Sequence, residues 1–237
     1  MDFVKTGISD LDNLFANGGY PLGNQILLIG GPGSGKSIFS AQFLYTGAKE
    51  YGEPGVYVTL EEPPEKIIRN ISPFGWDFKA LEGEGKIRFM DSVSLRAKGG
   101  RDVDQEVLKE SLDVDNMSLS IESTIEELSA KRLVIDSLSM MGLYTQDEFA
   151  LRSKLLRLSE MLSSKGVTSL LIFEATNRDV GVEEYPVEMF MFDGVITLEL
   201  DRNSKERKIS INKMRGTKHV IGAFRFKITD SGVEITL

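Results

Sequence analysis

The order of apolar and polar positions predicts strands and helices that alternate along most of the chain. Short, mostly apolar runs predict buried strands, whereas longer stretches with apolar residues three or four positions apart predict amphipathic helices. Strands are expected at residues 25–29, 56–60, 86–90, 133–135 and 168–173. Helices are expected at residues 10–15, with Ser9 as the N-cap, and at 37–51, 64–71, 118–131 and 148–163.

The apolar residues of each expected helix define the face that should be buried. In the helix at 37–51 this face holds Ile38, Ala41, Leu44 and Ala48. In the helix at 148–163 it holds Phe149, Leu155, Leu158 and Leu162. Residues 92–116 show no such pattern: they are polar, contain Gly99-Gly100 and many charges, and predict an exposed loop or irregular insert.

After Val195 the spacing changes, and closely spaced strands replace the alternation of strand and helix. These strands are expected at residues 195–200, 207–213, 223–228 and 233–236, a spacing typical of antiparallel hairpins. The sequence therefore predicts an α/β layered fold with a mostly parallel central sheet flanked by helices and with antiparallel C-terminal hairpins. No linker or internal repeat is visible, so residues 1–237 are expected to form a single domain.

Composition and charge exclude several classes of function. The 237 residues are 41% hydrophobic and 27% charged, which is typical of a globular protein. A net charge of −8 argues against a protein that coats duplex DNA with a basic surface. The absence of cysteine and the single histidine exclude disulfides, cysteine-ligated metal centres, thiol catalysis and a histidine metal triad. The N-terminus has no signal pattern and the apolar runs are short, so we expect a soluble, cytoplasmic protein.

A glycine-rich motif carries the most specific chemistry. Residues 30–37, GGPGSGKS, match the phosphate-binding pattern G-x-x-x-x-G-K-[ST] between an expected strand and an expected helix. The glycines allow backbone N–H groups to point into one concavity, and Lys36 would reach the β- and γ-phosphates while Ser37 ligates Mg²⁺. The alternative is a chance glycine turn with a solvated lysine. The expected nucleotide contacts here are Gly31, Pro32, Gly33, Ser34, Gly35, Lys36, Ser37 and Ile38.

Carboxylates follow two of the expected strands. Asp136 ends an apolar strand and would hold Mg²⁺ through water together with Ser37. Glu61 and Glu62 follow the strand at 56–60, where a glutamate can orient or deprotonate a water that attacks the γ-phosphate. Each has an ordinary alternative, because an aspartate at a strand end is common and Glu61-Glu62 also fits a solvated acidic pair before Pro63.

Taken together, these motifs resemble those of the KaiC-like ATPases of the RecA superfamily, including the single-domain archaeal proteins described as RadA paralogues. The similarity covers nearly the whole chain and is weakest across residues 92–131. It implies a RecA-like P-loop fold, ATP as the nucleotide and Mg²⁺ as its metal. The matching segments are TGI at 6–8 with Asp12, GGPGSGKS at 30–37 with FSAQFLY at 39–45, EPGVYVTLEE at 53–62, FGWD at 74–77, VIDS at 134–137 and KMRGTKH at 213–219.

The KMRGTKH segment bears on assembly. In KaiC-like hexamers the matching segment reaches across a subunit interface, so the resemblance implies that Lys213 and Arg215 act on a neighbour's γ-phosphate. It likewise implies that Met214, Thr217 and His219 approach the neighbouring nucleotide and that Thr229 and Asp230 lie near the base. The chain would then work as a homo-oligomer, most simply a head-to-tail hexameric ring. Taken alone, Lys213 and Arg215 also fit a cationic edge strand, and His219 a surface histidine.

Two activities known in related proteins are disfavoured. Residues 178–192 contain no serine or threonine, and Met189 and Phe190 occupy the place of the residues phosphorylated in KaiC, so an autokinase is not expected. The loop at 177–193, which would face the channel of a recombinase ring, has one arginine and five acidic residues and should repel single-stranded DNA. The apolar run at 189–192 fits either a subunit interface or a buried strand entry.

Three functions remain open from the sequence. The first is a Mg²⁺-dependent ATPase that hydrolyses the β–γ bond, with a regulatory or recombination and repair accessory role. The second is a nucleotide-gated interaction module with little turnover. The third is a DNA-binding relative of the RecA and RadA recombinases. The preference for adenine over guanine comes from the resemblance alone.

Overall fold

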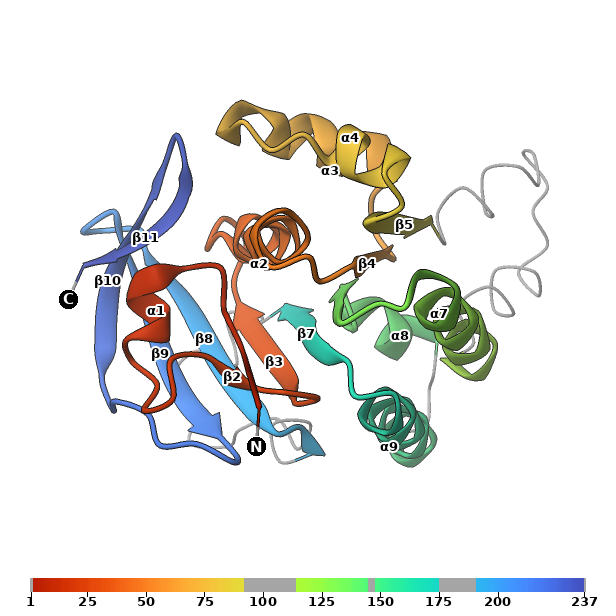
Figure 1. The fold of residues 1–237 in the computed structure, drawn as a ribbon. Coiled ribbons are helices and arrows are strands. Elements are labelled where there is room, and N and C mark those ends of the chain that lie inside the picture. Colours follow the sequence, from red (N-terminus) through yellow and green to blue (C-terminus); the bar gives the residue numbers. More distant parts are fainter. Residues whose placement is uncertain (1, 92–113, 145–147, 175–190, 237) are drawn as a thin grey trace.

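The fold is built on a nine-stranded sheet among the residues that the computed structural model describes, which are 2–91, 114–144, 148–174 and 191–236. The strand order is β11-β10-β9-β8-β3-β7-β6-β4-β5 (Figure 1). Six strands run parallel: β3 (Gln25–Gly30), β4 (Gly55–Thr59), β5 (Ile87–Asp91), β6 (Arg132–Asp136), β7 (Thr168–Glu174) and β8 (Gly194–Asp201). The strands β9 (Glu206–Met214), β10 (Ala223–Thr229) and β11 (Gly232–Thr236) continue the sheet antiparallel. The predicted mostly parallel sheet with antiparallel C-terminal hairpins is confirmed.

Helices cover both faces of this sheet, which explains why the central strands are apolar at nearly every position. In β3, Ile26 and Leu28 belong to one hydrophobic cluster and Leu27 and Ile29 to another. The first cluster packs under α1 (Ser9–Asp12), α2 (Lys36–Glu50), α3 (Pro64–Ile71) and α4 (Phe78–Gly83). The second packs under α7 (Val114–Leu128), α8 (Ser139–Tyr144) and α9 (Glu148–Ser164), on the other side of the sheet (Figure 1).

Several short elements are not predicted by the apolar pattern. They are α4, α8, the 3₁₀ turn Ser72–Phe74 and the two-stranded pair of β1 (Phe3–Val4) and β2 (Tyr20–Pro21). These elements are too short to show a helical or strand period of apolar residues, so only tertiary packing identifies them. Across the described residues, every helix is too short or too polar to cross a membrane.

The first helix differs from its prediction at both ends. Ser9 is the first helical residue of α1 and not its cap, because Ile8 occupies the N-cap position and provides no side-chain hydrogen bond. The helix ends at Asp12, earlier than the predicted residue 15. Phe15 instead forms an isolated β-bridge with His219, so pairing with the C-terminal part of the chain overrides the helical pattern.

Helices α7 and α9 also correct the sequence analysis. Helix α7 begins at Val114, so residues 114–116 are helical and not part of the predicted loop, and it ends at Leu128. Asp115 forms an ion pair with Arg157 of α9, which holds this early turn in place. The rest of the predicted loop, 92–113, lies outside the described residues. The burial predicted for Phe149 is wrong: it is 79% exposed, because it precedes Leu155 by six residues and points roughly 120° away from the buried face.

The remaining predicted helices and strands are confirmed to within a residue or two. Leu155, Leu158 and Leu162 form the buried face of α9 as expected. Because β3, β4, β6 and β7 are parallel, their carboxyl ends meet at one edge of the sheet. The residues that follow these four strands therefore come together in space.

Candidate functional site

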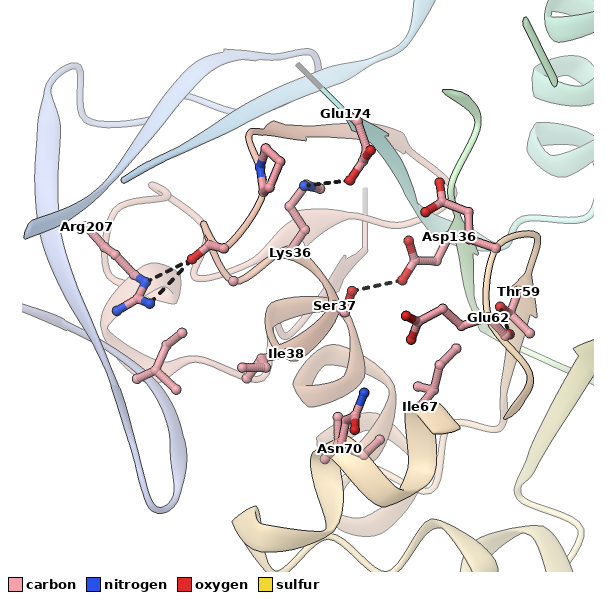
Figure 2. A pocket seen from close by; sticks show the side chains of 16 residues that line it. Lys36, Ser37, Ile38, Thr59, Glu62, Ile67, Asn70, Asp136, Glu174 and Arg207 are labelled. Atoms are coloured by element: carbon pink, nitrogen blue, oxygen red, sulfur yellow. Dashed lines mark hydrogen bonds and ion pairs between the residues drawn. The ribbon is translucent and has the colours of Figure 1, made fainter. Parts of the chain in front are cut away.

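A pocket of about 540 Å³ lies at this carboxyl edge, beside the N-terminus of α2 (Figure 2). Its walls come from four places: the glycine-rich loop after β3, the ends of β4, β6 and β7, the helix α3, and the C-terminal strands. The lining residues are Pro32, Gly33, Gly35, Lys36, Ser37, Ile38, Thr59, Glu61, Glu62, Ile67, Asn70, Ile71, Asp136, Glu174, Arg207 and Ile228.

The glycine-rich loop has a backbone conformation that residues with a Cβ atom rarely adopt. Gly33 and Gly35 have φ angles of +79° and +104°, in the left-handed region that favours glycine. At Gly30, an added Cβ would lie 2.6 Å from the carbonyl oxygen of Leu198, so the close approach of β8 also requires glycine. The loop and the start of α2 thus form the concavity expected of a phosphate-binding site.

Lys36 places a single buried cation at this concavity. Its Nζ donates hydrogen bonds to the carbonyl oxygens of Gly30 at 2.8 Å and Gly31 at 3.1 Å, and lies 3.5 Å from Oε1 of Glu174. The hydroxyl of Ser34 is fully buried in the same loop and has no hydrogen-bond partner among the described residues. The Ser34 hydroxyl does not line the pocket, so Lys36 is the group here that fits an oxyanion such as a phosphate.

Ser37 and Asp136 meet beside the loop, as the sequence predicts for two metal ligands. The Ser37 hydroxyl donates to Oδ2 of Asp136 at 3.0 Å, and the hydroxyl of Tyr57 donates to the same oxygen at 2.6 Å. Burial raises the pKa of Asp136, while the hydrogen bonds from Tyr57 and Ser37 oppose that shift. No three acidic or histidine side chains among the described residues are placed to hold one metal ion together, so a Mg²⁺ here would complete its shell with phosphate and water oxygens.

Glu61 and Glu62 both line the pocket, but their surroundings differ. The carboxylate of Glu61 accepts a hydrogen bond from the hydroxyl of Ser137, the residue after Asp136. Burial is the largest cause of its raised pKa. The carboxylate of Glu62 forms an ion pair of 2.6 Å with Lys66, one helical turn further along. Glu61 is therefore held beside the end of β6, where Asp136 lies, whereas Glu62 is paired with its own neighbour along the chain.

The residues expected to act on a neighbouring subunit do not line the pocket of their own chain. Strand β9 runs antiparallel to β8, so its first residues lie near the glycine-rich loop and its last, Met214, pairs with Gly194 at the opposite edge. Lys213 donates a hydrogen bond to the carbonyl oxygen of Phe192. Nη1 of Arg215 lies 3.4 Å from Oδ1 of Asp193. The two ends of β9 are roughly 25 Å apart along the strand.

The other members of this expected set divide between the two edges. Thr217 and His219 follow Lys213–Arg215 along the chain and do not line the pocket. Thr217 accepts a hydrogen bond from Asn17, and His219 forms a β-bridge with Phe15. Thr229, directly after the pocket residue Ile228, is the last residue of β10, and Asp230 begins the turn to β11.

For the apolar run at 189–192, directly before β8, the sequence left open a subunit interface or a buried entry to the strand. Phe192 is fully buried, which confirms the buried interpretation for this residue. Met189, Phe190 and the acidic residues at 177–190 lie outside the described residues, so the interface interpretation and the predicted repulsion of DNA stay predictions.

The pocket includes residues that the sequence analysis did not select. Glu174 ends β7 and contacts Lys36, while Arg207 donates to the carbonyl oxygen of Gly33 at 3.3 and 3.4 Å (Figure 2). Arg207 precedes the buried Ile209 by two residues in β9, so the two side chains share one face of the strand, and this spacing could have marked Arg207 as facing inward. Tyr57 looks like any core aromatic in the sequence, and no local pattern marks its contact with Asp136.

Comparisons with known proteins agree with one another. The family described as "ATPase: KaiC" matches residues 4–237. A UPF0273 protein of Methanopyrus kandleri is 37% identical, over 99% of this chain and 92% of that protein. The circadian clock oscillator protein KaiC of Parathermosynechococcus lividus is 35% identical over 98% of this chain, which corresponds to 42% of that protein. The crystal structure of a KaiC-like protein from Pyrococcus horikoshii has a TM-score of 0.83 and 39% identity, over 100% of this chain and 99% of that chain.

Proposed function

This chain belongs to the KaiC family of ATPases, and on that premise we propose that it binds Mg²⁺-ATP in the pocket at the carboxyl edge of the sheet and hydrolyses its β–γ bond. The observation that carries this proposal is the convergence of four side chains around one concavity. Lys36, Ser37, Asp136 and Glu61 come from α2, β6 and the end of β4, and all of them line the same pocket.

Each of these side chains has a role that follows from its position. The backbone N–H groups of the glycine-rich loop and the ammonium of Lys36 would hold the phosphates. Ser37 and Asp136 would hold the metal, which neutralises phosphate charge when bound. Glu61 would orient the attacking water and accept its proton, since its carboxylate is partly buried and held by Ser137. Glu62 is the weaker candidate for this role because Lys66 already neutralises its charge.

The nucleoside part of the ligand would occupy the side of the pocket away from the carboxylates. Arg207 and Glu62 lie on opposite sides of the pocket (Figure 2). Arg207 is fixed on the loop through Gly33, and Ile228 supplies an apolar surface beside Gly35. A guanidinium and an aliphatic side chain are suitable surfaces for the flat faces of a purine. Asp230, in the turn two residues after Ile228, would lie near the base.

We further propose a head-to-tail homo-oligomer, with a hexameric ring as the expected form. In one chain the pocket and the Lys213–Arg215 segment lie at opposite edges of the sheet, so these cations cannot reach their own nucleotide without rearrangement of β9. A second copy related by rotation would bring them to it, and repeating the same contact closes a ring. Lys213 and Arg215 would then stabilise charge that develops on the transferred phosphoryl group.

Lys36→Ala tests the proposed activity directly. Binding of a fluorescent ATP analogue and phosphate release would be measured with and without Mg²⁺, for the wild type and the variant. We expect Mg²⁺-dependent phosphate release from the wild type and loss of most of it in Lys36→Ala. Tight binding without release would favour the nucleotide-gated module instead. Absence of binding by a folded wild-type protein would reject both functions.

A further inference from the structure

One buried hydroxyl outside the phosphate-binding motif reaches the metal-binding side of the pocket. The hydroxyl of Tyr57, in β4, donates to Oδ2 of Asp136 at 2.6 Å, within the range of a strong hydrogen bond from a hydroxyl to a carboxylate. Ser37, in the first turn of α2, donates to the same oxygen at 3.0 Å. Three elements of the fold therefore converge on a single carboxylate oxygen.

The position of this hydroxyl is fixed by packing. Tyr57 is fully buried, and its ring stacks on Phe89 of β5 with centroids 5.3 Å apart and planes inclined by 23°. Strand β4 lies between β5 and β6, and Tyr57 is paired with Val134, two residues before Asp136. A tyrosine held on both sides in this way cannot turn its hydroxyl elsewhere without disrupting the core.

The hydrogen-bond arrangement leaves the right atoms available for a cation. Because both donors use Oδ2, the orientation of the carboxylate is set, and Oδ1 accepts no hydrogen bond from the described residues. A serine hydroxyl has one hydrogen and two lone pairs, so Ser37 can donate to Asp136 and still offer a lone pair to a metal. Groups that orient a ligand in this way typically strengthen metal binding although they do not touch the metal.

From this geometry we propose that Tyr57 is a positioning residue for the Mg²⁺ site: it holds Asp136, together with Ser37, in the orientation that accepts the hydrated cation of Mg²⁺-ATP. The inference rests on the proposed binding of Mg²⁺-ATP and goes beyond it, because it assigns the metal requirement partly to a residue outside the nucleotide motifs. A purely structural tyrosine would affect the stability of the fold and leave the metal requirement unchanged.

Tyr57→Phe separates these two roles, since it keeps the aromatic ring and its stack on Phe89 and removes only the hydroxyl. The matched control is Tyr20→Phe. Tyr20 is equally buried, but its hydroxyl has no hydrogen-bond partner among the described residues and does not line the pocket. Both variants remove one buried tyrosine hydroxyl from the same domain.

The measurement is a Mg²⁺ titration of the binding of a fluorescent ATP analogue, with thermal unfolding of each nucleotide-free protein recorded in parallel. We expect Tyr57→Phe to need roughly tenfold more Mg²⁺ for half-saturation, the lower end of the usual effect of such orienting groups. Binding without Mg²⁺ should be unchanged, and Tyr20→Phe should match the wild type throughout. Mn²⁺ binding to the protein–nucleotide complex, followed by electron paramagnetic resonance, should weaken in Tyr57→Phe alone.

Two outcomes would overturn the inference. An unchanged Mg²⁺ half-saturation in Tyr57→Phe, with or without a lower unfolding temperature, would show that the hydroxyl is only structural. A wild-type protein that binds the nucleotide with no dependence on Mg²⁺ would instead reject the proposed function, and the inference with it. The wild-type titration thus distinguishes the two failures.

Discussion

The ammonium nitrogen of Lys36 lies 3.5 Å from a carboxylate oxygen of Glu174, the last residue of the strand beside β3. The lysine that should bind phosphate therefore already has a negatively charged partner at the end of β7. An incoming γ-phosphate must compete with this carboxylate and with the carbonyl oxygens of Gly30 and Gly31. Nucleotide binding should thus be weaker than the cationic loop alone would allow.

Glu174→Gln should tighten ATP binding, because it removes a negative charge near the phosphates and keeps the shape of the side chain. The Glu174 side chain is about half exposed, so solvent screens its charge, and we expect roughly a fivefold lower dissociation constant, equivalent to about 1 kcal/mol. Glu160→Gln, which removes one exposed charge from α9, is the control. Titration at two salt concentrations should show the gain shrinking with salt. Equal or weaker binding by Glu174→Gln would contradict the prediction.

Glu61→Gln and Glu62→Gln should differ in their effects on hydrolysis. Glu61 is held beside Asp136 by Ser137, whereas Glu62 is paired with Lys66. We expect Glu61→Gln to bind ATP normally and to lose phosphate release by about 100-fold or more, the usual contribution of a general base. Glu62→Gln should retain most of its turnover. The reverse ranking in a single-turnover assay would reassign the base to Glu62.

The opposite placement of the pocket and Arg215 predicts complementation between two inactive variants. In the proposed ring, Lys36→Ala would lack a working pocket and Arg215→Ala would lack the cation that a subunit supplies to its neighbour. Random mixing in equal amounts should pair an intact pocket with an intact arginine at about a quarter of the interfaces of a ring. We therefore expect phosphate release near that fraction of the wild-type rate after co-refolding or subunit exchange. If Arg215 acted within its own chain, the mixture would stay inactive.

Gly47→Ala should destabilise the fold although Gly47 lies within α2, three residues before its end, where alanine normally favours a helix. An added Cβ would collide with the guanidinium of Arg132, which is fully buried and fixed by hydrogen bonds of 2.7 Å to Glu53 and to the carbonyl oxygen of Phe43. We expect a loss of about 1–3 kcal/mol in the free energy of unfolding.

Gly83→Ala is the matched control for that substitution. Gly83 is the last residue of α4, and an added Cβ would meet no atom within 4 Å. Its stability in denaturant titrations should equal or slightly exceed that of the wild type. A Gly47→Ala protein as stable as Gly83→Ala would show that Arg132 can move aside.

The fold and the phosphate loop were predictable because they leave local signals in the sequence. The strand at 25–29 and the pattern ending in Lys36-Ser37 depend on residues that are close along the chain. The contacts of Tyr57 with Asp136, and of Lys36 with Glu174, join residues 79 and 138 positions apart, and no local pattern encodes them. The predicted burial of Phe149 is wrong although the apolar pattern is local, because an apolar residue near a helix end can point away from the buried face, and Phe149 is 79% exposed.

Strand β9 has a consequence for how neighbouring subunits could communicate. Arg207, near its start, touches the glycine-rich loop through Gly33, and Arg215 follows its last residue at the far edge of the sheet. In the proposed ring, each copy of this strand would touch two nucleotides, one at each end. A strand that is hydrogen-bonded on both sides within a sheet is stiff along its length. A shift of its first residues when one site binds nucleotide would therefore move Arg215 at the neighbouring site.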